Sequence, residues 1–191
     1  MSALPGTTGR LRIYLMRHGF VDYTSEEVRR TRDPSIVSLT PAGEDEARAA
    51  GAALSEVHFD LAICSGLKRT RQTAELVLAE HPDAPDLEVE QRFEELRSGQ
   101  YINFESAEHL AATMTFMFEQ AGEPDAEFLP GGEKFSDAMV RIMDGLSDLL
   151  MRPDWATALV VAHEVVNRMV LASVIGAPLG ASAGFEQDTG C

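Results

Sequence analysis

The sequence predicts a three-layer α/β domain, with a mainly parallel sheet covered by helices on both faces. Short apolar runs alternate with segments of helical periodicity, and residues 158–162 form a continuous apolar run. Such alternation is typical of strand–helix–strand units, and a wholly apolar strand is typical of the buried centre of a parallel sheet. No shift in composition divides the chain, so we treat residues 1–191 as a single domain.

The first predicted strand covers residues 11–16 and ends in Arg17, His18 and Gly19. In open parallel sheets, ligands bind beyond the carboxyl ends of the strands. A permanently charged guanidinium beside an imidazole suits an anion such as a phosphoryl group. Taken alone, the same three residues are also typical of a polar strand end at the surface.

The next unit is a loop followed by a helix. Residues 20–38 have no clear periodicity and predict a long loop over the strand ends, a place for substrate contacts. Thr40 and Pro41 predict the N-cap and the first residue of a helix. The small face of this helix, suited to close packing on the sheet, consists of Ala47, Ala50, Gly51 and Leu54.

A second strand is predicted over residues 59–64, followed by a turn at Ser65 and Gly66 with a candidate helix cap. A helix is predicted after this turn, because Leu67, Thr70, Ala74, Val77 and Leu78 follow at helical spacing. Its first turns carry three cations, which cost about 0.3–1 kcal/mol each at this end of a helix unless an anion is bound there. These cations, which indicate an anion site unless they all point into solvent, are Lys68, Arg69 and Arg71.

A short third strand is predicted over residues 87–91, and it leads to the adjacent carboxylates Glu94 and Glu95. Adjacent carboxylates usually lie at a solvated surface, and we expect this of at least one of them. A helix is predicted over residues 105–120. It carries a stripe that we interpret as core, formed by Leu110, Met114, Met117 and Phe118.

The strongest helical pattern lies between residues 130 and 153 and predicts a helix that covers one face of the sheet. The last predicted strand, residues 158–162, ends in His163, as the first ends in His18. Parallel strands end at one edge of the sheet, so we expect the two imidazoles to share that edge. The apolar positions of the strong helix are Phe135, Met139, Ile142, Met143, Leu146, Leu149 and Leu150.

The charge of the chain limits its partners. With 16 Lys and Arg against 31 Asp and Glu, the formal net charge is −15, which argues against nucleic acid or an anionic membrane as a partner. Residues 1–9 lack the pattern of a secretory signal, and no apolar run is long enough to span a bilayer, so we expect a cytoplasmic protein. Cys64 and Cys191 are too few for a disulfide framework.

Five segments carry a family resemblance: Arg17-His18-Gly19, residues 64–75 (CSGLKRTRQTAE), Glu95 with Gly99, residues 131–133 (GGE) and residues 161–163 (VAH). In this order, and with residues 39–43 (LTPAG) between the first two, they resemble the histidine phosphatase superfamily, which has the phosphoglycerate-mutase-like fold. The resemblance covers nearly the whole chain.

This resemblance implies roles for individual residues. His18 matches the nucleophile that becomes phosphorylated, and Glu95 matches the proton donor better than Glu94 does. Guanidinium and imidazolium groups can neutralise the transferred phosphoryl group, so we expect neither a metal nor another cofactor. The residues that match the phosphoryl-binding positions are Arg17, Arg69 and His163.

Three departures from the family's pattern bear on function. Glu164 follows His163 where a glycine is common, which leaves open whether it repels phosphate, points away, or shares the acid role; a second branch of the superfamily has its donor acid at this place. Phe20 and Val21 replace the acidic and hydroxyl residues typical of the mutases. Relatives continue beyond residues 185–191 into another strand, so we expect a shortened chain or a sheet without that edge.

We therefore predict a phosphatase that hydrolyses a small phosphomonoester through a phosphohistidine on His18, with a small cap at about residues 100–130. A phosphoglycerate-type mutase is the alternative enzyme. Glu164 keeps open a third class, a weakly active binding or regulatory protein or a phosphatase of protein phosphohistidine. We also leave open a homodimer.

Overall fold

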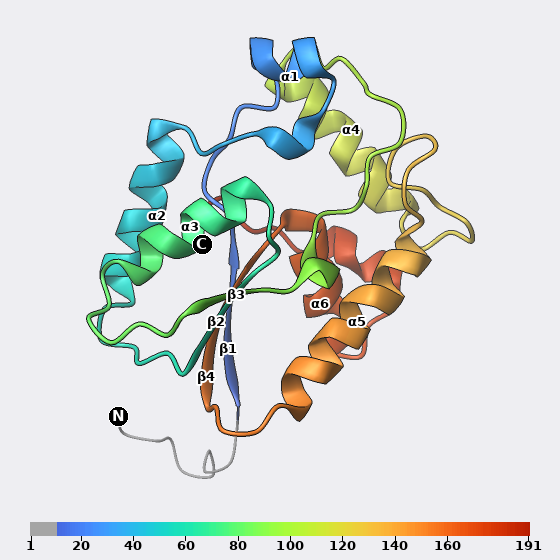
Figure 1. Ribbon diagram of the computed structural model, residues 1–191. Coiled ribbons are helices and arrows are strands. Elements are labelled where there is room, and N and C mark those ends of the chain that lie inside the picture. The colour runs from blue at the N-terminus through green and yellow to red at the C-terminus, as the bar shows by residue number, and fades with distance from the viewer. Residues whose placement is uncertain (1–10) are drawn as a thin grey trace.

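The centre of the fold is a four-stranded parallel sheet, seen in a computed structural model that describes residues 11–191 (Figure 1). The order across the sheet is β1-β4-β2-β3, and each neighbouring pair is parallel. The predicted fold class is confirmed, whereas the expectation for residues 1–9 lies outside the described residues. The strands are β1 (Arg12–Arg17), β2 (Leu61–Cys64), β3 (Leu87–Val89) and β4 (Thr157–Ala162).

Helices cover both faces of this sheet. On one face, α2 (Pro41–Ala53) and α3 (Lys68–Leu78) pack against the side chains of Ala62 and Val161. On the other face lie α5 (Phe135–Met151) and α6 (Glu164–Val174) (Figure 1). All six residues of β4 are buried, as predicted for the central strand.

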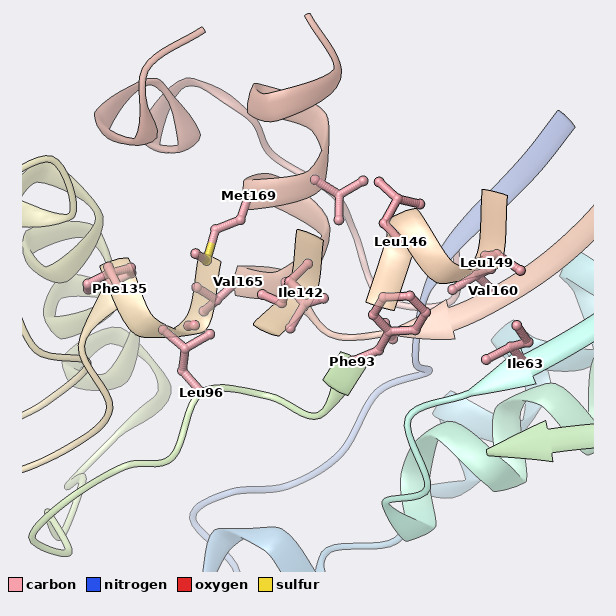
Figure 2. Packing of buried hydrophobic residues seen from close by; sticks show 14 of the residues in the cluster. Ile63, Phe93, Leu96, Phe135, Ile142, Leu146, Leu149, Val160, Val165 and Met169 are labelled. Atoms are coloured by element: carbon pink, nitrogen blue, oxygen red, sulfur yellow. The ribbon is translucent and has the colours of Figure 1, made fainter. Parts of the chain in front are cut away.

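The helix α5 forms the larger half of the core, as its sequence pattern predicted. Figure 2 shows its side chains close to those of β2, β4 and α6. The exception is Leu150, predicted as an apolar core position, which is 44% exposed because it lies on the outer face of the last turn. The core contacts shown there involve Phe135, Ile142, Leu146, Leu149, Ile63, Val160, Val165 and Met169.

The start of α2 packs tightly against the chain that leaves β1. Thr40 caps the helix as predicted, since its hydroxyl oxygen accepts from Gly43 N–H at 3.2 Å. A Cβ on Gly43 would lie 2.2 Å from the carbonyl oxygen of Phe20, and one on Gly19 would lie 2.3 Å from Gly43 O. Only glycine permits this approach, which holds the backbone just after His18 in place.

The prediction of a long loop over residues 20–38 is wrong in part. The segment contains α1 (Glu26–Thr31) and the 3-10 turn η1 (Pro34–Ile36). Ser25 caps α1 by accepting from Val28 N–H, and Val28 is the buried residue of this helix. A helix of six residues with a single buried side chain leaves no apolar periodicity to detect.

The helix α4 (Ala107–Gln120) lies with α1 beyond the carboxyl ends of the strands (Figure 1). Its predicted stripe is only partly core. Phe118 is 4% exposed, but Leu110 and Met114 are half-buried and line a cavity. The core interpretation is therefore wrong for Leu110, because a sequence stripe does not distinguish a core from a cavity wall.

The last residues lie against the carboxyl end of β1. After η3 (Leu179–Gly184), the backbone N–H of Arg17 donates to Cys191 O at 2.8 Å, and Gly190 N–H donates to His18 O at 3.2 Å. Within residues 11–191, β1 is an edge strand of the sheet. Among the described helices, none combines the length and the apolar character needed to cross a membrane.

Candidate active site

A cavity of about 910 Å³ opens at the carboxyl ends of the strands and collects most of the predicted site residues. Five of the six line it: Arg17, His18, Arg69, Glu95 and Glu164. The sixth, His163, is fully buried beside His18, with 5.3 Å between the two ring centroids. The predicted meeting of the two strand-end imidazoles is confirmed.

His18 is held as a neutral imidazole with one nitrogen available to the cavity. Its Nδ1 lies 2.8 Å from Gly19 O, so Nδ1 carries the proton and donates it to this carbonyl. The other nitrogen, Nε2, accepts from the Nε–H of Arg69 at 3.2 Å. Burial, and then the charge of Arg69, lower the pKa of His18 to about 3. The Nε2 lone pair is therefore unprotonated at neutral pH.

Of the three cations predicted at the start of α3, only Arg69 reaches the cavity. Arg69 is 3% exposed, whereas Lys68 and Arg71 are exposed and point to solvent. Besides His18, its guanidinium donates to Ser35 O at 3.3 Å. The interpretation as an anion site thus applies to one residue of the three.

The sequence suggested that the turn at Ser65 caps α3, but in the structure Ser65 contacts His163 and does not cap this helix. The N-cap is Leu67, without a side-chain hydrogen bond, after a turn in which Gly66 has φ of 100°. Ser65 Oγ lies 2.8 Å from His163 Nε2 and 2.9 Å from Thr70 Oγ1.

This hydroxyl chain fixes the protonation of His163. Thr70 donates its hydroxyl proton to Leu67 O at 2.8 Å, so Ser65 donates to Thr70 and accepts from His163 Nε2–H. Burial, followed by the charge of Arg69, lowers the pKa of His163 well below its usual value. Among residues 11–191, its buried Nδ1 has no hydrogen-bond partner. Neutral His163 therefore has a bare Nδ1 lone pair beside His18.

Glu95 lies at the amino-terminal end of α6. Its carboxylate accepts from Leu96 N–H at 3.1 Å and from Val165 N–H, in the first turn of α6, at 3.3 Å. Glu95 is half-buried, and burial is the main reason that its pKa is raised. Glu94 also lines the cavity. A raised pKa favours the protonated carboxyl that a proton donor needs.

Glu164 is paired with two arginines. Its carboxylate lies 2.8 Å from Arg17 Nη2 and also accepts from Arg168 Nη2. Of the three alternatives left by the sequence, pointing away is thus excluded for this conformation. Sequence reasoning missed Arg168, although the spacing of an acid and a base four residues apart on a helix is a signal for such a pair.

Tyr23 is a further cavity residue that the sequence left unassigned. Its hydroxyl is 3.5 Å from His18 Nε2, and the guanidinium carbon of Arg69 lies 5.7 Å from its ring centroid. It comes from the segment 20–38, where we expected substrate contacts. Within residues 11–191, no group of three or more His, Cys, Asp or Glu could hold a metal ion.

A comparison with known protein families covers almost the whole chain. The profile of the histidine phosphatase superfamily (branch 1) matches residues 13–191. The chain belongs to this superfamily. The resemblance stated from the site motifs is therefore confirmed, and the match begins within β1 and continues to residue 191.

Members of the superfamily with different names are similar to the chain. A Serratia proteamaculans protein named "Probable phosphoglycerate mutase GpmB" is 30% identical over 176 residues, which span 88% of this chain and 76% of that protein. The adenosylcobalamin/alpha-ribazole phosphatase of Escherichia coli is 29% identical over 186 residues, 95% of this chain and 87% of that protein. The crystal structure of the alpha-ribazole phosphatase from Shigella flexneri has the same fold, with a TM-score of 0.73, 23% identity and coverage of 95% and 88%.

Proposed function

We propose that the chain is a phosphatase that hydrolyses a phosphomonoester through a phosphohistidine on His18. The observation that carries this proposal is the unprotonated Nε2 of His18, which faces the Arg69 guanidinium in a cavity that also holds Glu95. A nucleophile, a fixed cation and an acid with a raised pKa are the parts that phosphoryl transfer needs.

In the first step, the lone pair of His18 Nε2 attacks phosphorus. A P–N bond forms, the P–O bond to the leaving group breaks, and Glu95 gives its proton to the departing oxygen. The proton on Nδ1 stays hydrogen-bonded to Gly19 O, which stabilises the cationic ring of the phosphohistidine. The alcohol leaves, and Glu95 remains as a carboxylate.

In the second step, water replaces the alcohol. Glu95 takes a proton from the water, and the oxygen of this water attacks phosphorus. The P–N bond breaks and returns its electron pair to His18 Nε2. Inorganic phosphate leaves, with both residues back in their starting protonation states. No metal is needed in this cycle, because the charge on the phosphoryl oxygens is matched by guanidinium groups.

We propose that three groups hold the phosphoryl oxygens: Arg69, Arg17 and His163. Arg69 already contacts His18 Nε2, and Arg17 lines the same cavity, with its Nη1 donating to Gln187 O and its Nη2 paired with Glu164, so phosphate must compete with Glu164 for this guanidinium. His163 can contribute only as a donor, so it must take up a proton on Nδ1 when the phosphate dianion arrives. We also propose that residues 100–130, with α4, act as a cap over this site.

A phosphoglycerate mutase is the second candidate, favoured by the name of the Serratia relative. A mutase must hold a carboxylate and keep water from the phosphohistidine. Interconversion of 2- and 3-phosphoglycerate that outruns release of inorganic phosphate would favour the mutase over our proposal.

The proposal is tested by measuring phosphate release from a panel of phosphomonoesters in the presence of a chelator. We expect turnover that His18→Ala abolishes, since no other cavity residue can replace the attacking imidazole. His58→Ala is the matched control, because His58 is an exposed histidine paired with Asp60 outside the cavity. Turnover that survives in His18→Ala would contradict the proposal.

A further inference from the structure

The cavity extends well beyond the volume that a phosphoryl group needs. Its volume of about 910 Å³ is at the upper end of the roughly 300–1,000 Å³ that is usual for small-molecule sites. The charged residues that hold the phosphoryl group come from the strand ends and from the starts of α3 and α6. The remaining space is bounded mainly by two segments that contribute no strand to the sheet, residues 20–35 and residues 96–129.

The part of this wall formed by residues 96–129 is mostly apolar and in part aromatic. Phe118 and Phe128 are buried in the core cluster on one side and face the cavity on the other. The side chains of Phe104, Leu110 and Met114 are half-buried, so part of their surface stays in contact with water in the empty cavity. We define this apolar chamber by Phe104, Leu110, Met114, Phe118 and Phe128.

The arginines that line the cavity leave little cationic capacity for a second anionic group. Arg17 and Arg168 share Glu164, and Arg168 also lies over the Phe118 ring, 4.1 Å from its centroid. Arg69 is committed to His18 and Ser35. The fourth, Arg97, has a side chain that is 81% exposed.

Acidic side chains surround the same space. Besides Glu95, the carboxylates that line the cavity without forming an ion pair in the described part of the chain are Asp22, Asp33, Glu94, Glu119 and Glu186. A substrate with a carboxylate or a second phosphate would face these charges with only Arg97 at the rim to balance it. A neutral apolar group meets no such penalty. It also gains binding free energy by removing the half-buried apolar side chains of the wall from water.

From this we infer that the leaving group of the substrate is a bulky, uncharged, apolar ring system that occupies the apolar chamber. This inference rests on the proposed function, because it places the phosphoryl group at His18. It names the chemistry of the substrate and not an individual compound. It also argues against phosphoglycerate, whose leaving group carries a carboxylate.

The direct test compares three alkyl phosphates with similar leaving-group chemistry: 2-naphthylmethyl phosphate, ethyl phosphate and 3-phosphoglycerate. We expect kcat/KM for the naphthylmethyl ester to exceed that for each of the others by roughly 10- to 100-fold, the gain typical of burying one large apolar group. Comparable His18-dependent rates for the three esters would overturn the inference and leave the proposed function standing.

Two substitutions of Leu110 in α4 test whether the preference for the naphthylmethyl ester comes from the apolar chamber. Leu110→Glu places a charge in the apolar chamber and should lower the ratio of the naphthylmethyl to the ethyl rate by tenfold or more, and the milder Leu110→Ala should lower it by about threefold. Phe116→Glu is the matched control, because Phe116 is on the same helix, is 60% exposed and does not line the cavity. A ratio that falls equally in the control would contradict the assignment.

Binding of phosphonates that the protein cannot hydrolyse tests this inference independently of the proposed function. Calorimetry with 2-naphthylmethylphosphonate and ethylphosphonate, which cannot be hydrolysed at the P–C bond, reports the preference without turnover. We expect tighter binding of the naphthyl compound, lost in Leu110→Glu. Such a preference without hydrolysis of any ester would support the chamber and contradict the phosphatase, whereas equal binding would contradict the chamber.

Discussion

At the scale of single residues, the site combines side chains that the sequence identified with contacts that it could not. The sequence predicted that His18 and His163 share one edge of the sheet, because each follows a strand and parallel strands end at the same edge; that β1 and β4 are neighbours was not predicted. The pairing of Glu164 with Arg17 was not predictable, since it depends on side-chain conformations at the meeting of β1 and α6. Tyr23 was missed for the same reason.

Glu95 is expected to act as the proton donor. Glu95→Gln should slow hydrolysis of alkyl phosphates by ~10²–10⁴-fold while sparing p-nitrophenyl phosphate, whose leaving group needs no proton. Steady-state rates with the two ester types measure this contrast. Glu94→Gln is the control, because Glu94 is an adjacent carboxylate that also lines the cavity. If Glu164→Gln gives the leaving-group-dependent loss and Glu95→Gln does not, the donor is Glu164.

Glu164 is expected to compete with phosphate for Arg17. Glu164→Gln keeps the size of the side chain but frees Arg17 Nη2, so inorganic phosphate should inhibit roughly threefold to tenfold more strongly. Inhibition constants measured at fixed ionic strength check this. Glu186→Gln removes the same charge from an exposed position on the cavity wall and should have a smaller effect. Weaker inhibition in Glu164→Gln would mean that Glu164 holds Arg17 in its binding position.

At the scale of elements, the long periodic segments were predictable and the short ones were not. The helix α5 and the strand β4 have many apolar positions in register, so their patterns are clear. The helix α1 has one buried residue, Val28, and is held by its cap and by charges at its ends. The wall formed by α4 carries the same apolar pattern as a core helix, and its cavity becomes visible only in three dimensions.

The contact between β1 and α2 links an element junction to the site. Gly43→Ala would place a Cβ 2.2 Å from Phe20 O, and relief must shift the backbone beside Gly19, whose carbonyl holds His18 Nδ1. We expect a loss of about 1–3 kcal/mol in the free energy of unfolding, the usual cost of overpacking, together with a lower kcat. Urea unfolding and turnover assays measure the two effects. Gly184→Ala, where a Cβ meets no atom within 4 Å, should change neither.

At the scale of the whole molecule, the buried histidines make stability depend on pH. The folded protein holds His18 neutral down to a pKa of about 3, and the pKa of His163 is also lowered, whereas both take up protons near their ordinary pKa of about 6.5 when unfolded. Between these pH values the unfolded state binds more protons, so the free energy of unfolding falls as pH falls from about 6.5.

Unfolding midpoints in urea at pH 7.5 and pH 5.5 test this dependence. We expect a lower midpoint at pH 5.5, and a smaller difference in His18→Asn, which removes one of the two histidines. His109→Asn, at an exposed position on α4, should retain the full difference. A midpoint that does not change between the two pH values would mean that the buried histidines take up protons in the folded state.

The central claim is that His18 carries the phosphoryl group during the reaction. The measurement is to mix the protein with a phosphomonoester, quench within one turnover under alkaline conditions that preserve phosphohistidine, and map the phosphorylated residue by mass spectrometry. We predict one acid-labile phosphoryl group on Nε2 of His18, and none in His18→Ala. A phosphoryl group on Ser65 or Cys64, or phosphate release without a phosphorylated His18 at any quench time, would contradict the account.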